Sequence, residues 1–480
     1  MSDLFTRRVR TIALALAASI TAACSDDNNP AGPQPAADTC ANATGVISAD
    51  ITANCTLLSS KTYVLQGYRK VTNGATLTIQ AGTKITGPTT GPSALFITRG
   101  AKIDAQGTAA APIVFTSAQA VGSRRPGDWG GLIIIGNAPT NRVGPVNTEG
   151  PAPENYGQGT NATDNSGTLK YVRTEFAGYA EIVNEELNSF TFYAVGSGTT
   201  LDFLQSVAGL DDSFEWFGGT VDAKHLVSYE SGDDHFDWTE GYRGRNQFLI
   251  AYQSRRLAPV PPGTLSSDPQ GFEGDGCELG PPQKCAAEGY FSKPYSMPVF
   301  ANFTAIGTGT LVSGYPSGGG IGIRVRRGTG GFFVNGIVAR WPNKGFNLRD
   351  AATDSLRKID SLVMKNVLFA QNTANFDPEG NATELGWPSK FVVTGSGIVQ
   401  DGGTAGSHFV ALPADTNNTS AASFDWTPSA TSASRNGGLA TFTGTLAARA
   451  GAAVTGTAYV GAADPNGPKW WQGWTTYVVR

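Results

Sequence analysis

Six carboxylates recur at a fixed spacing in residues 209–241, which read GLDDSFEWFGGTVDAKHLVSYESGDDHFDWTEG. A shift of 22 residues aligns this segment with itself, so that the acidic positions of the first half fall on those of the second. Equivalent residues of stacked coils lie about 4.8 Å apart, which would gather the six into one cluster. Carboxylates this close raise one another's pKa values or bind a cation. The six are Asp211, Asp212, Glu215, Asp233, Asp234 and Asp237.

Three uses of this cluster are open on the sequence. Asp side chains at the corners of coils can bond backbone N–H groups in turns. Hard carboxylate oxygens can instead bind a structural Ca²⁺, with Glu273 and Asp275 of the GFEGDG run adding ligands if that segment folds back. Paired carboxylates are also what glycoside hydrolysis needs. We expect a turn or calcium role ahead of catalysis.

The catalytic alternative has specific gaps. The run SGDD resembles the paired-Asp motif of polygalacturonases, which are parallel β-helices, but the chain has no Asn-Thr-Asp run and no Gly-His-Gly run. A calcium-dependent lyase would need an arginine beside the ion. Arg340 and Arg349 are available, although surface charge is the simpler role for both. His225 and His235 flank the acidic turns, and we interpret them as surface residues.

Four aromatic residues are candidate platforms for sugar stacking. Sugars pack against flat aromatic faces, while burial is the usual fate of a single large aromatic side chain. The candidates are Trp129, Tyr242, Trp341 and Trp387.

The elements that would position these residues are short strands joined by glycine-rich turns. Charged residues are only 15% of the 480, against about 25% in a typical domain. Apolar residues alternate with polar ones in runs such as ATLTIQAGTKITG and PIVFTSA, which end at turn residues. The sequence therefore predicts an all-β chain, a right-handed parallel β-helix with coils of about 22 residues. Its interior would include Leu77, Ile79, Ile85, Leu95, Ile97, Ile103, Ile113 and Phe115.

The predicted boundaries follow composition. The β-helix with its N-terminal cap spans 40–370, interrupted by Pro- and Gly-rich insertions at 137–168 and 255–298. Residues 371–480 are a less regular continuation whose aromatic end, KWWQGWTTYVV, would cap the solenoid or pack along its side.

The N-terminus reads as an export signal. Three arginines precede a short apolar run, TIALALAASI, and the following TAAC resembles a bacterial lipobox, which implies cleavage after residue 23 and lipidation of Cys24. An ordinary secretory signal is the alternative. Residues 24–39 would be a flexible tether. The other four cysteines form two local pairs typical of disulfides in an oxidising compartment, Cys40 with Cys55 and Cys277 with Cys285.

Long motifs give the chain a resemblance to a known family. They are WGGLIIIGNAPTN, NSGTLKYVRTEFAGY, DDSFEWFGGTVDAKHLVSYESGDDHFDWTEGYRG and WWQGWTTY. The chain resembles an uncharacterised family of secreted lipoproteins of Gram-negative bacteria, often found among proteins of outer-membrane nutrient uptake. The resemblance covers most of residues 60–480. It implies a right-handed parallel β-helix and assigns no catalytic residues.

These observations predict a lipid-anchored protein of the outer membrane or cell surface. We expect a non-enzymatic binding or scaffold module, for polysaccharide or for partners in nutrient uptake. The alternatives are a polysaccharide-degrading enzyme, either polygalacturonase-like or a calcium-dependent lyase, and a self-associating structural surface protein. The net charge of −4 gives no reason to expect nucleic-acid binding.

Overall fold

The computed structural model describes residues 38–180, 187–277, 279, 285, 288–312, 315–413 and 420–477. The predicted signal peptide, the predicted lipidation site Cys24 and nearly all of the predicted tether lie outside these residues. From Ala37 onward the chain forms one compact unit. Within the described part, no helix has both the length and the apolar character needed to cross a bilayer.

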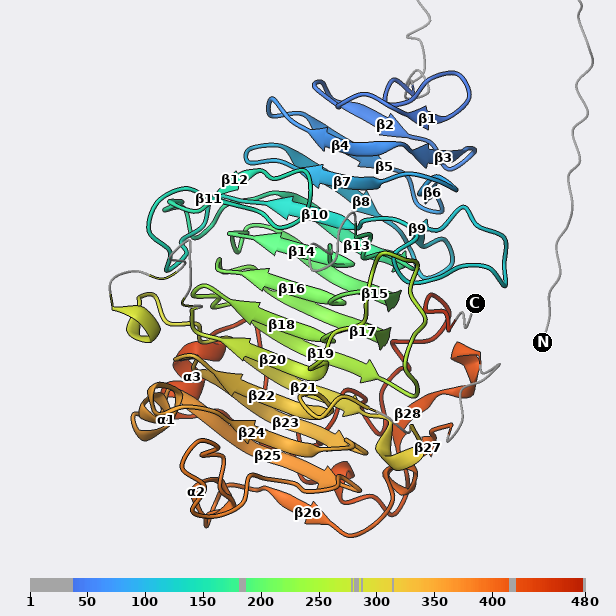
Figure 1. The fold of residues 1–480 in the computed structure, drawn as a ribbon. Coiled ribbons are helices and arrows are strands. Elements are labelled where there is room, and N and C mark those ends of the chain that lie inside the picture. The colour runs from blue at the N-terminus through green and yellow to red at the C-terminus, as the bar shows by residue number, and fades with distance from the viewer. Residues whose placement is uncertain are drawn as a thin grey trace, which may run out of the picture. The chain divides into compact units, whose positions relative to one another are not determined.

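Two sheets of parallel strands build the fold (Figure 1). The first, sheet A, contains β1 (Val46–Ile47), β3 (Thr62–Leu65), β6 (Lys84–Thr86), β9 (Ile113–Thr116), β13 (Gly167–Glu175), β15 (Thr200–Gly209), β17 (Ala223–Ser231), β19 (Arg245–Tyr252), β21 (Val299–Ile306), β23 (Gly331–Ala339), β25 (Leu362–Ala370) and β26 (Val399–Asp401), with β2 (Cys55–Leu57), β5 (Thr76–Ile79) and β8 (Lys102–Gln106) beside them. Sheet B contains β4 (Gly67–Val71), β7 (Ser93–Ile97), β10 (Leu132–Ile135), β14 (Phe190–Tyr193), β16 (Phe214–Phe217), β18 (Phe236–Thr239), β20 (Gln270–Asp275), β22 (Ile321–Arg326) and β24 (Lys344–Leu348). The chain alternates between the sheets, so the predicted all-β parallel β-helix is confirmed.

Each later coil contains one long, bent strand. β13 pairs with β8 through its first half and with β9 through its second, and Tyr171 between the halves has a φ of 50°. The same left-handed bend recurs at Phe203, His225 and Phe248 in the next three coils. The rings at these bends stack, with centroids 4.3 Å apart for Tyr171 and Phe203 and 4.2 Å for Phe203 and His225. After that the bend residues are Asn302, Asn335 and Asn366, and asparagine tolerates positive φ better than most residues.

The interior is apolar along its whole length. All eight interior residues predicted for the first coils are buried. Farther along, an aromatic ladder crosses four coils, with successive ring centroids 5.0, 5.5 and 4.9 Å apart in the order Phe190, Phe214, Phe236 and Phe272. Trp216 and Trp238 lie beside this ladder with no exposed surface. Parallel strands pack in this way because each coil must bury its inward residues against its neighbours.

The 22-residue period holds only where the turns are short. Phe214 pairs with Phe236, 22 residues later, but Phe236 pairs with Phe272, 36 residues later. The extra residues enter between β19 and β20. The range 255–298 predicted as an insertion therefore needs correction, because it contains β20, a strand of sheet B.

The C-terminal region covers the outer face of sheet A. β27 (Phe409–Ala411), β28 (Asp425–Pro428) and the segment around Trp471 form a second apolar cluster with outward residues of sheet A. Trp474 reaches back to β13, where its carbonyl accepts a bond of 2.7 Å from Arg173 Nη1. The aromatic end thus packs along the side and does not cap the solenoid. Helix α3 (Gly444–Ala450) packs beside it on residues of β21 and β23.

Other segments close the ends and one side of the solenoid. A disulfide joins Cys40 and Cys55 at the N-terminal end. At the other end, helix α2 (Pro388–Phe391) brings Phe391 onto Phe346 of β24, with ring centroids 4.8 Å apart, and helix α1 (Ala351–Lys358) precedes β25. A flap at 137–166 carries the hairpin of β11 (Val146–Asn147) and β12 (Asn155–Tyr156), which packs on the apolar outer face of β7, β10 and β14.

Candidate functional site: an acidic pocket on sheet B

A ladder of corner side chains leads into sheet B. In each of four successive coils, one corner residue stands two positions before the phenylalanine of the aromatic ladder. Its side-chain oxygen accepts a hydrogen bond from the backbone N–H at the equivalent position of the next coil. These bonds run from Asp212 N to Asn188 Oδ1 (3.1 Å), from Asp234 N to Asp212 Oδ1 (2.8 Å), from Gln270 N to Asp234 Oδ1 (2.5 Å) and from Ile321 N to Gln270 Oε1 (2.9 Å). Asp212 and Asp234 therefore do have a structural role at the corners, between coils and not within a turn.

A second row of residues faces outward from sheet B. Strand alternation turns the residue after each ladder aromatic away from the core. The register places them side by side in the order Thr191, Glu215, Asp237, Glu273, Arg324 and Asn347. The predicted pairing of Glu215 with Asp237 is present, and Glu273 continues the row from the next coil. Three adjacent carboxylates thus meet an arginine at one end.

These rows line a pocket of about 280 Å³. The flap adds Glu149, and the turn after β18 adds Glu240. Among the described residues, Arg326 and Arg327 are the basic residues of the lining. The carboxylates around it are Glu149, Asp211, Asp212, Glu215, Asp233, Asp237, Glu240, Glu273 and Asp275. Seven of the eight predicted metal ligands line this pocket, and the eighth, Asp234, lies at the corner beside it.

Burial makes this concentration of charge costly. Glu215, Asp234 and Glu273 are all less than a tenth exposed. Desolvation, followed by the charges of neighbouring carboxylates, raises the pKa values of Asp212, Glu215, Asp234 and Asp237 well above their usual range. Desolvation also raises the pKa of Glu273 to about 8, against the opposing effect of Arg326.

Arginines neutralise one edge of the pocket. Arg326 Nε donates to Asp275 Oδ1 at 2.8 Å, and its Nη2 pairs with Glu273. Arg327 Nη1 donates to the second Asp275 oxygen at 2.6 Å. These carboxylates raise the pKa of Arg326, despite its burial, so its guanidinium stays charged. Both oxygens of Asp275 are thus engaged in ion pairs.

Asp237 Oδ1 and Glu273 Oε1 are buried in the pocket without a hydrogen-bond donor among the residues that the structure describes. Arg324 Nη1 lies 3.8 Å from Glu273 Oε1. The carboxylates also form three overlapping groups, and within each group one oxygen per residue lies within 4.8 Å of the others. The groups are Asp211 with Asp212 and Asp233, Asp212 with Glu215 and Asp237, and Asp234 with Asp237 and Glu273. Hard oxygens converging from three coils are the donor set that Ca²⁺ takes, usually six to eight at a time.

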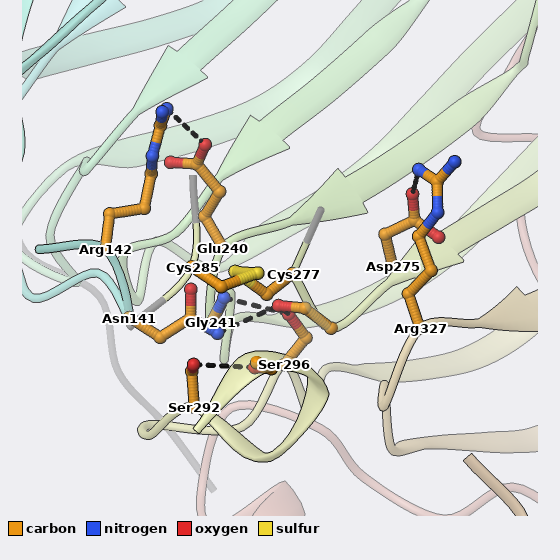
Figure 2. Close-up of a disulfide and its surroundings, with 12 residues drawn as sticks. Asn141, Arg142, Glu240, Gly241, Asp275, Cys277, Cys285, Ser292, Ser296 and Arg327 are labelled. Carbon is orange, nitrogen blue, oxygen red and sulfur yellow. Dashed lines mark hydrogen bonds and ion pairs between the residues drawn. A yellow bond between two sulfur atoms is a disulfide. The ribbon is translucent and has the colours of Figure 1, made fainter. Parts of the chain in front are cut away.

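The rim of the pocket is tied to the flap and to a disulfide (Figure 2). Arg142 of the flap pairs with Glu240, with Nη1 2.7 Å from Oε1. Asn141 Nδ2 donates to the Gly276 carbonyl at 2.8 Å, directly before the Cys277–Cys285 disulfide. Gly241 N donates to Ser296 Oγ at 2.8 Å. These bonds hold the ends of β18 and β20 and the base of the flap in one place.

The aromatic platforms expected from the sequence are not at the site. Trp129, Tyr242 and Trp341 are 0–1% exposed and belong to the core, so the prediction that they stack on a ligand is wrong. Aromatic residues in a solenoid coil pack inward whenever the alternation points them there. Trp387 is half-buried, and its ring packs against Lys390 Nζ at 4.2 Å beside helix α2.

The interpretation of the flanking histidines needs one correction. His235 is 1% exposed, its Nδ1 lies 2.6 Å from Ser228 Oγ, and burial lowers its pKa to about 3. It is therefore a neutral core residue. His225 is half-buried at a coil bend, with Nδ1 2.7 Å from Asp202 Oδ1. Arg340, a lyase candidate, is buried in a corner where its Nε donates to the Gly307 carbonyl. Neither Arg340 nor Arg349 lines the acidic pocket.

Sequence reasoning missed four charged residues of the pocket, Glu149, Glu240, Arg326 and Arg327. Glu240 could have been predicted from the sequence, because it follows Asp237 in the same repeat. The GIRVRR run also gives a signal, because its strand pairs with the GFEGDG strand and places Arg326 beside Asp275. Glu149 carries no comparable signal, because it lies in the aperiodic flap.

Fold and site together define the class, a parallel β-helix with an acidic pocket on its outer face. The family model of the pectate-lyase-like β-helix domain matches residues 49–411, and the chain belongs to this family. This membership is compatible with the polysaccharide-degrading alternative. Neither the curated proteins nor the solved structures contain a match.

Proposed function

We propose that this protein is an exported, non-enzymatic binding module that takes up Ca²⁺ in the acidic pocket and holds acidic polysaccharide through the bound ion. The supporting observation is the charge of the lining, where nine carboxylates face two arginines among the described residues. A negatively charged polymer would be repelled by such a pocket unless a cation is present.

The residues fit calcium in kind and in position. Asp237 and Glu273 each contribute a buried oxygen without a hydrogen-bond donor, and both belong to groups whose oxygens already converge. Asp211, Asp233 and Asp237 are half-buried and are therefore the more accessible of these carboxylates. Ca²⁺ accepts six to eight oxygens in flexible geometry. Coordination positions that the protein does not fill would therefore be open to the carboxylates of uronate groups.

Export and anchoring belong to the same proposal. Two disulfides support an oxidising compartment, and the lipobox-like run before Cys24 supports a lipid anchor. A surface anchor would place the pocket where extracellular polysaccharide occurs.

The test is a binding assay with polygalacturonate and with neutral dextran, each in calcium and in excess chelator. We expect binding to polygalacturonate in calcium alone. The Asp237→Asn variant should lose it, whereas Asp104→Asn, which removes a carboxylate on β8 away from the pocket, should keep it. Binding that survives chelation, or no binding to any acidic polysaccharide, would refute the proposal.

An enzyme is the second candidate. The family match favours it, and so does Glu273, because a carboxyl with a pKa of about 8 is protonated and able to act as an acid near neutral pH. A lyase of this type also needs a base, and Arg326 is held charged by its ion pair with Asp275. Incubation with the same polymers should therefore give no unsaturated or reducing ends. Their release, lost in Asp237→Asn, would establish the enzyme instead.

A further inference from the structure

We propose that Lys344 and Asp377 condense into an intramolecular amide bond, which closes the C-terminal end of the solenoid covalently. Lys344 begins β24, which lies at the C-terminal edge of sheet B, and Ala374 of the following segment pairs with it in a parallel bridge. The side chains of Lys344 and Asp377 meet between these two neighbouring coils, with Nζ 3.1 Å from Oδ1. An amine and a carboxyl held this close react far more readily than the same groups free in solution.

The surroundings of the pair disfavour separate charges. The side chain of Asp377 has no exposed surface, and that of Lys344 is 15% exposed. Phe376, the neighbour of Asp377 in the chain, packs against the rings of Phe346 and Phe391, with centroids 6.1 and 6.4 Å away. Removing two opposite charges from water is costly, and a neutral amide between the same atoms avoids that cost.

Backbone N–H groups hold one oxygen of the Asp377 carboxyl. Leu348 N and Gly386 N donate to Oδ2 at 3.0 and 2.9 Å. A Cβ at position 386 would lie 2.7 Å from this oxygen, so a larger residue would push the two apart. Two fixed N–H donors stabilise the negative charge that an oxygen gains when its carbon is attacked. The other oxygen, Oδ1, accepts Asn347 Nδ2 at 2.7 Å and faces Lys344, so Oδ1 is the one that departs.

Glu384 supplies the proton transfer, because its Oε2 pairs with the same Nζ atom of Lys344. A carboxylate in contact with an ammonium can accept its protons and pass them on. Glu384 takes a proton from Lys344, and the nitrogen lone pair attacks Cγ of Asp377 while negative charge gathers on Oδ2. The Cγ–Oδ1 bond then breaks, and Oδ1 leaves as water with two protons that came from the ammonium through Glu384. One ammonium and one carboxylate thus become one amide and one water, with no other reactant.

A neighbouring ion pair lacks these features. Lys390 Nζ lies 3.3 Å from Asp354 Oδ1, which Arg357 Nε also contacts at 2.7 Å. Burial is outweighed there by hydrogen bonds from Arg357 and Lys358, which lower the pKa of Asp354 to about 2. A carboxyl kept ionised by several cations resists attack at its carbon. The pair of Lys390 with Asp354 is therefore an internal control.

The proposed bond would do at one end of the solenoid what a disulfide does at the other. Cys40 and Cys55 are joined at the N-terminal end. All five cysteines precede residue 286, so no disulfide within the chain can close the last coils. An amide between Lys344 and Asp377 would instead tie β24 to the segment that covers it.

The test is peptide mapping of the full chain by mass spectrometry, after incubation at neutral pH in chelator. Trypsin cuts after free lysine side chains and not after one whose Nζ carries an acyl group. We expect residues 341–349 to stay uncut at Lys344 and to be joined to residues 366–390, at their combined mass less one water. Cleavage after Lys390 should be normal. The readout is a mass, so it does not depend on calcium or polysaccharide binding.

Three variants complete the test. Lys344→Arg keeps the positive charge but cannot form the amide, so its peptides should be unlinked and its melting temperature lower. Glu384→Gln should also be unlinked, whereas the control Lys390→Arg should keep the link. Peptides of unmodified mass in the natural protein would overturn the proposal and leave an ion pair at this position. A link that persists in Glu384→Gln would overturn the proton transfer assigned to Glu384.

Discussion

At the scale of the residue, the acidic cluster divides into side chains with a structural task and side chains without one. Asp212 and Asp234 each use one oxygen to accept the backbone N–H of the next coil. Asp237, in the outward row, has a buried oxygen with no donor among the described residues. The turn role and the calcium role considered for the sequence are therefore compatible. Oxygens of Asp212 and Asp234 bond to the backbone, while an oxygen of Asp237 is available to an ion.

Replacing Asp237 with asparagine tests the effect of its negative charge, because the size of the side chain hardly changes. The amide keeps the size of the side chain and removes one repelling charge, so the chelated protein should become more stable. Calcium affinity should fall about tenfold or more, because a charged ligand is lost. Calorimetry and thermal melting check both effects, with Asp104→Asn as the control. Unchanged calcium affinity would exclude Asp237 as a ligand.

The raised pKa values predict how stability depends on pH without metal. A carboxyl whose pKa is higher in the folded than in the unfolded protein holds its proton longer when folded. For Glu273 the window runs from about 4.3 in the unfolded chain to about 8. The free energy of unfolding in chelator should therefore fall as pH rises through this window. Denaturant titrations at pH 5 and pH 8 measure it, and a stability that rises with pH would contradict the assigned burial.

At the scale of the element, the site depends on where the ends of strands are held. The Cys277–Cys285 disulfide follows β20 directly, and Gly276 between them accepts the bond from the flap residue Asn141 (Figure 2). The flap contributes Glu149 to the pocket, whereas the coils contribute most of the other carboxylates. A change at this junction, where the flap meets the end of β20 beside the disulfide, should therefore affect calcium affinity as well as the stability of the fold.

Removing this disulfide by the Cys277→Ser, Cys285→Ser double change should lower the free energy of unfolding by about 2–3 kcal/mol, as expected for a short loop. It should also weaken calcium binding. The matched Cys40→Ser, Cys55→Ser variant should lose stability at the N-terminal cap and keep its calcium affinity. Equal calcium affinity in both variants would show that the junction does not shape the pocket.

How far the sequence predicts these elements depends on the turns. The 22-residue self-match predicts that Glu215 lies beside Asp237, because a short turn preserves the period. The next coil adds residues before β20, so Glu273 could be suggested as a ligand but not recognised as the next strand residue. The burial of His235 and Trp129 was also missed, because a local pattern does not show what packs over a given face.

At the scale of the whole molecule, the pocket brings together parts of the chain that lie far apart in the sequence. Carboxylates from the turns before β16 and β18, from three strands of sheet B and from the flap meet there. The C-terminal region covers the opposite sheet and leaves this face to the flap. An ion bound to the pocket would cross-link coils and flap, so its effect should appear in the stability of the whole fold.

The most direct test of the central claim is calcium titration of the metal-stripped protein, followed by calorimetry and by thermal melting. Saturable calcium binding is expected, with a higher melting temperature, since a ligand at 100 times its Kd stabilises a fold by about 2.7 kcal/mol. The gain should be larger at pH 8 than at pH 5, because protons compete for the same carboxylates. Absence of calcium binding at pH 8, with an unchanged melting temperature, would contradict the account.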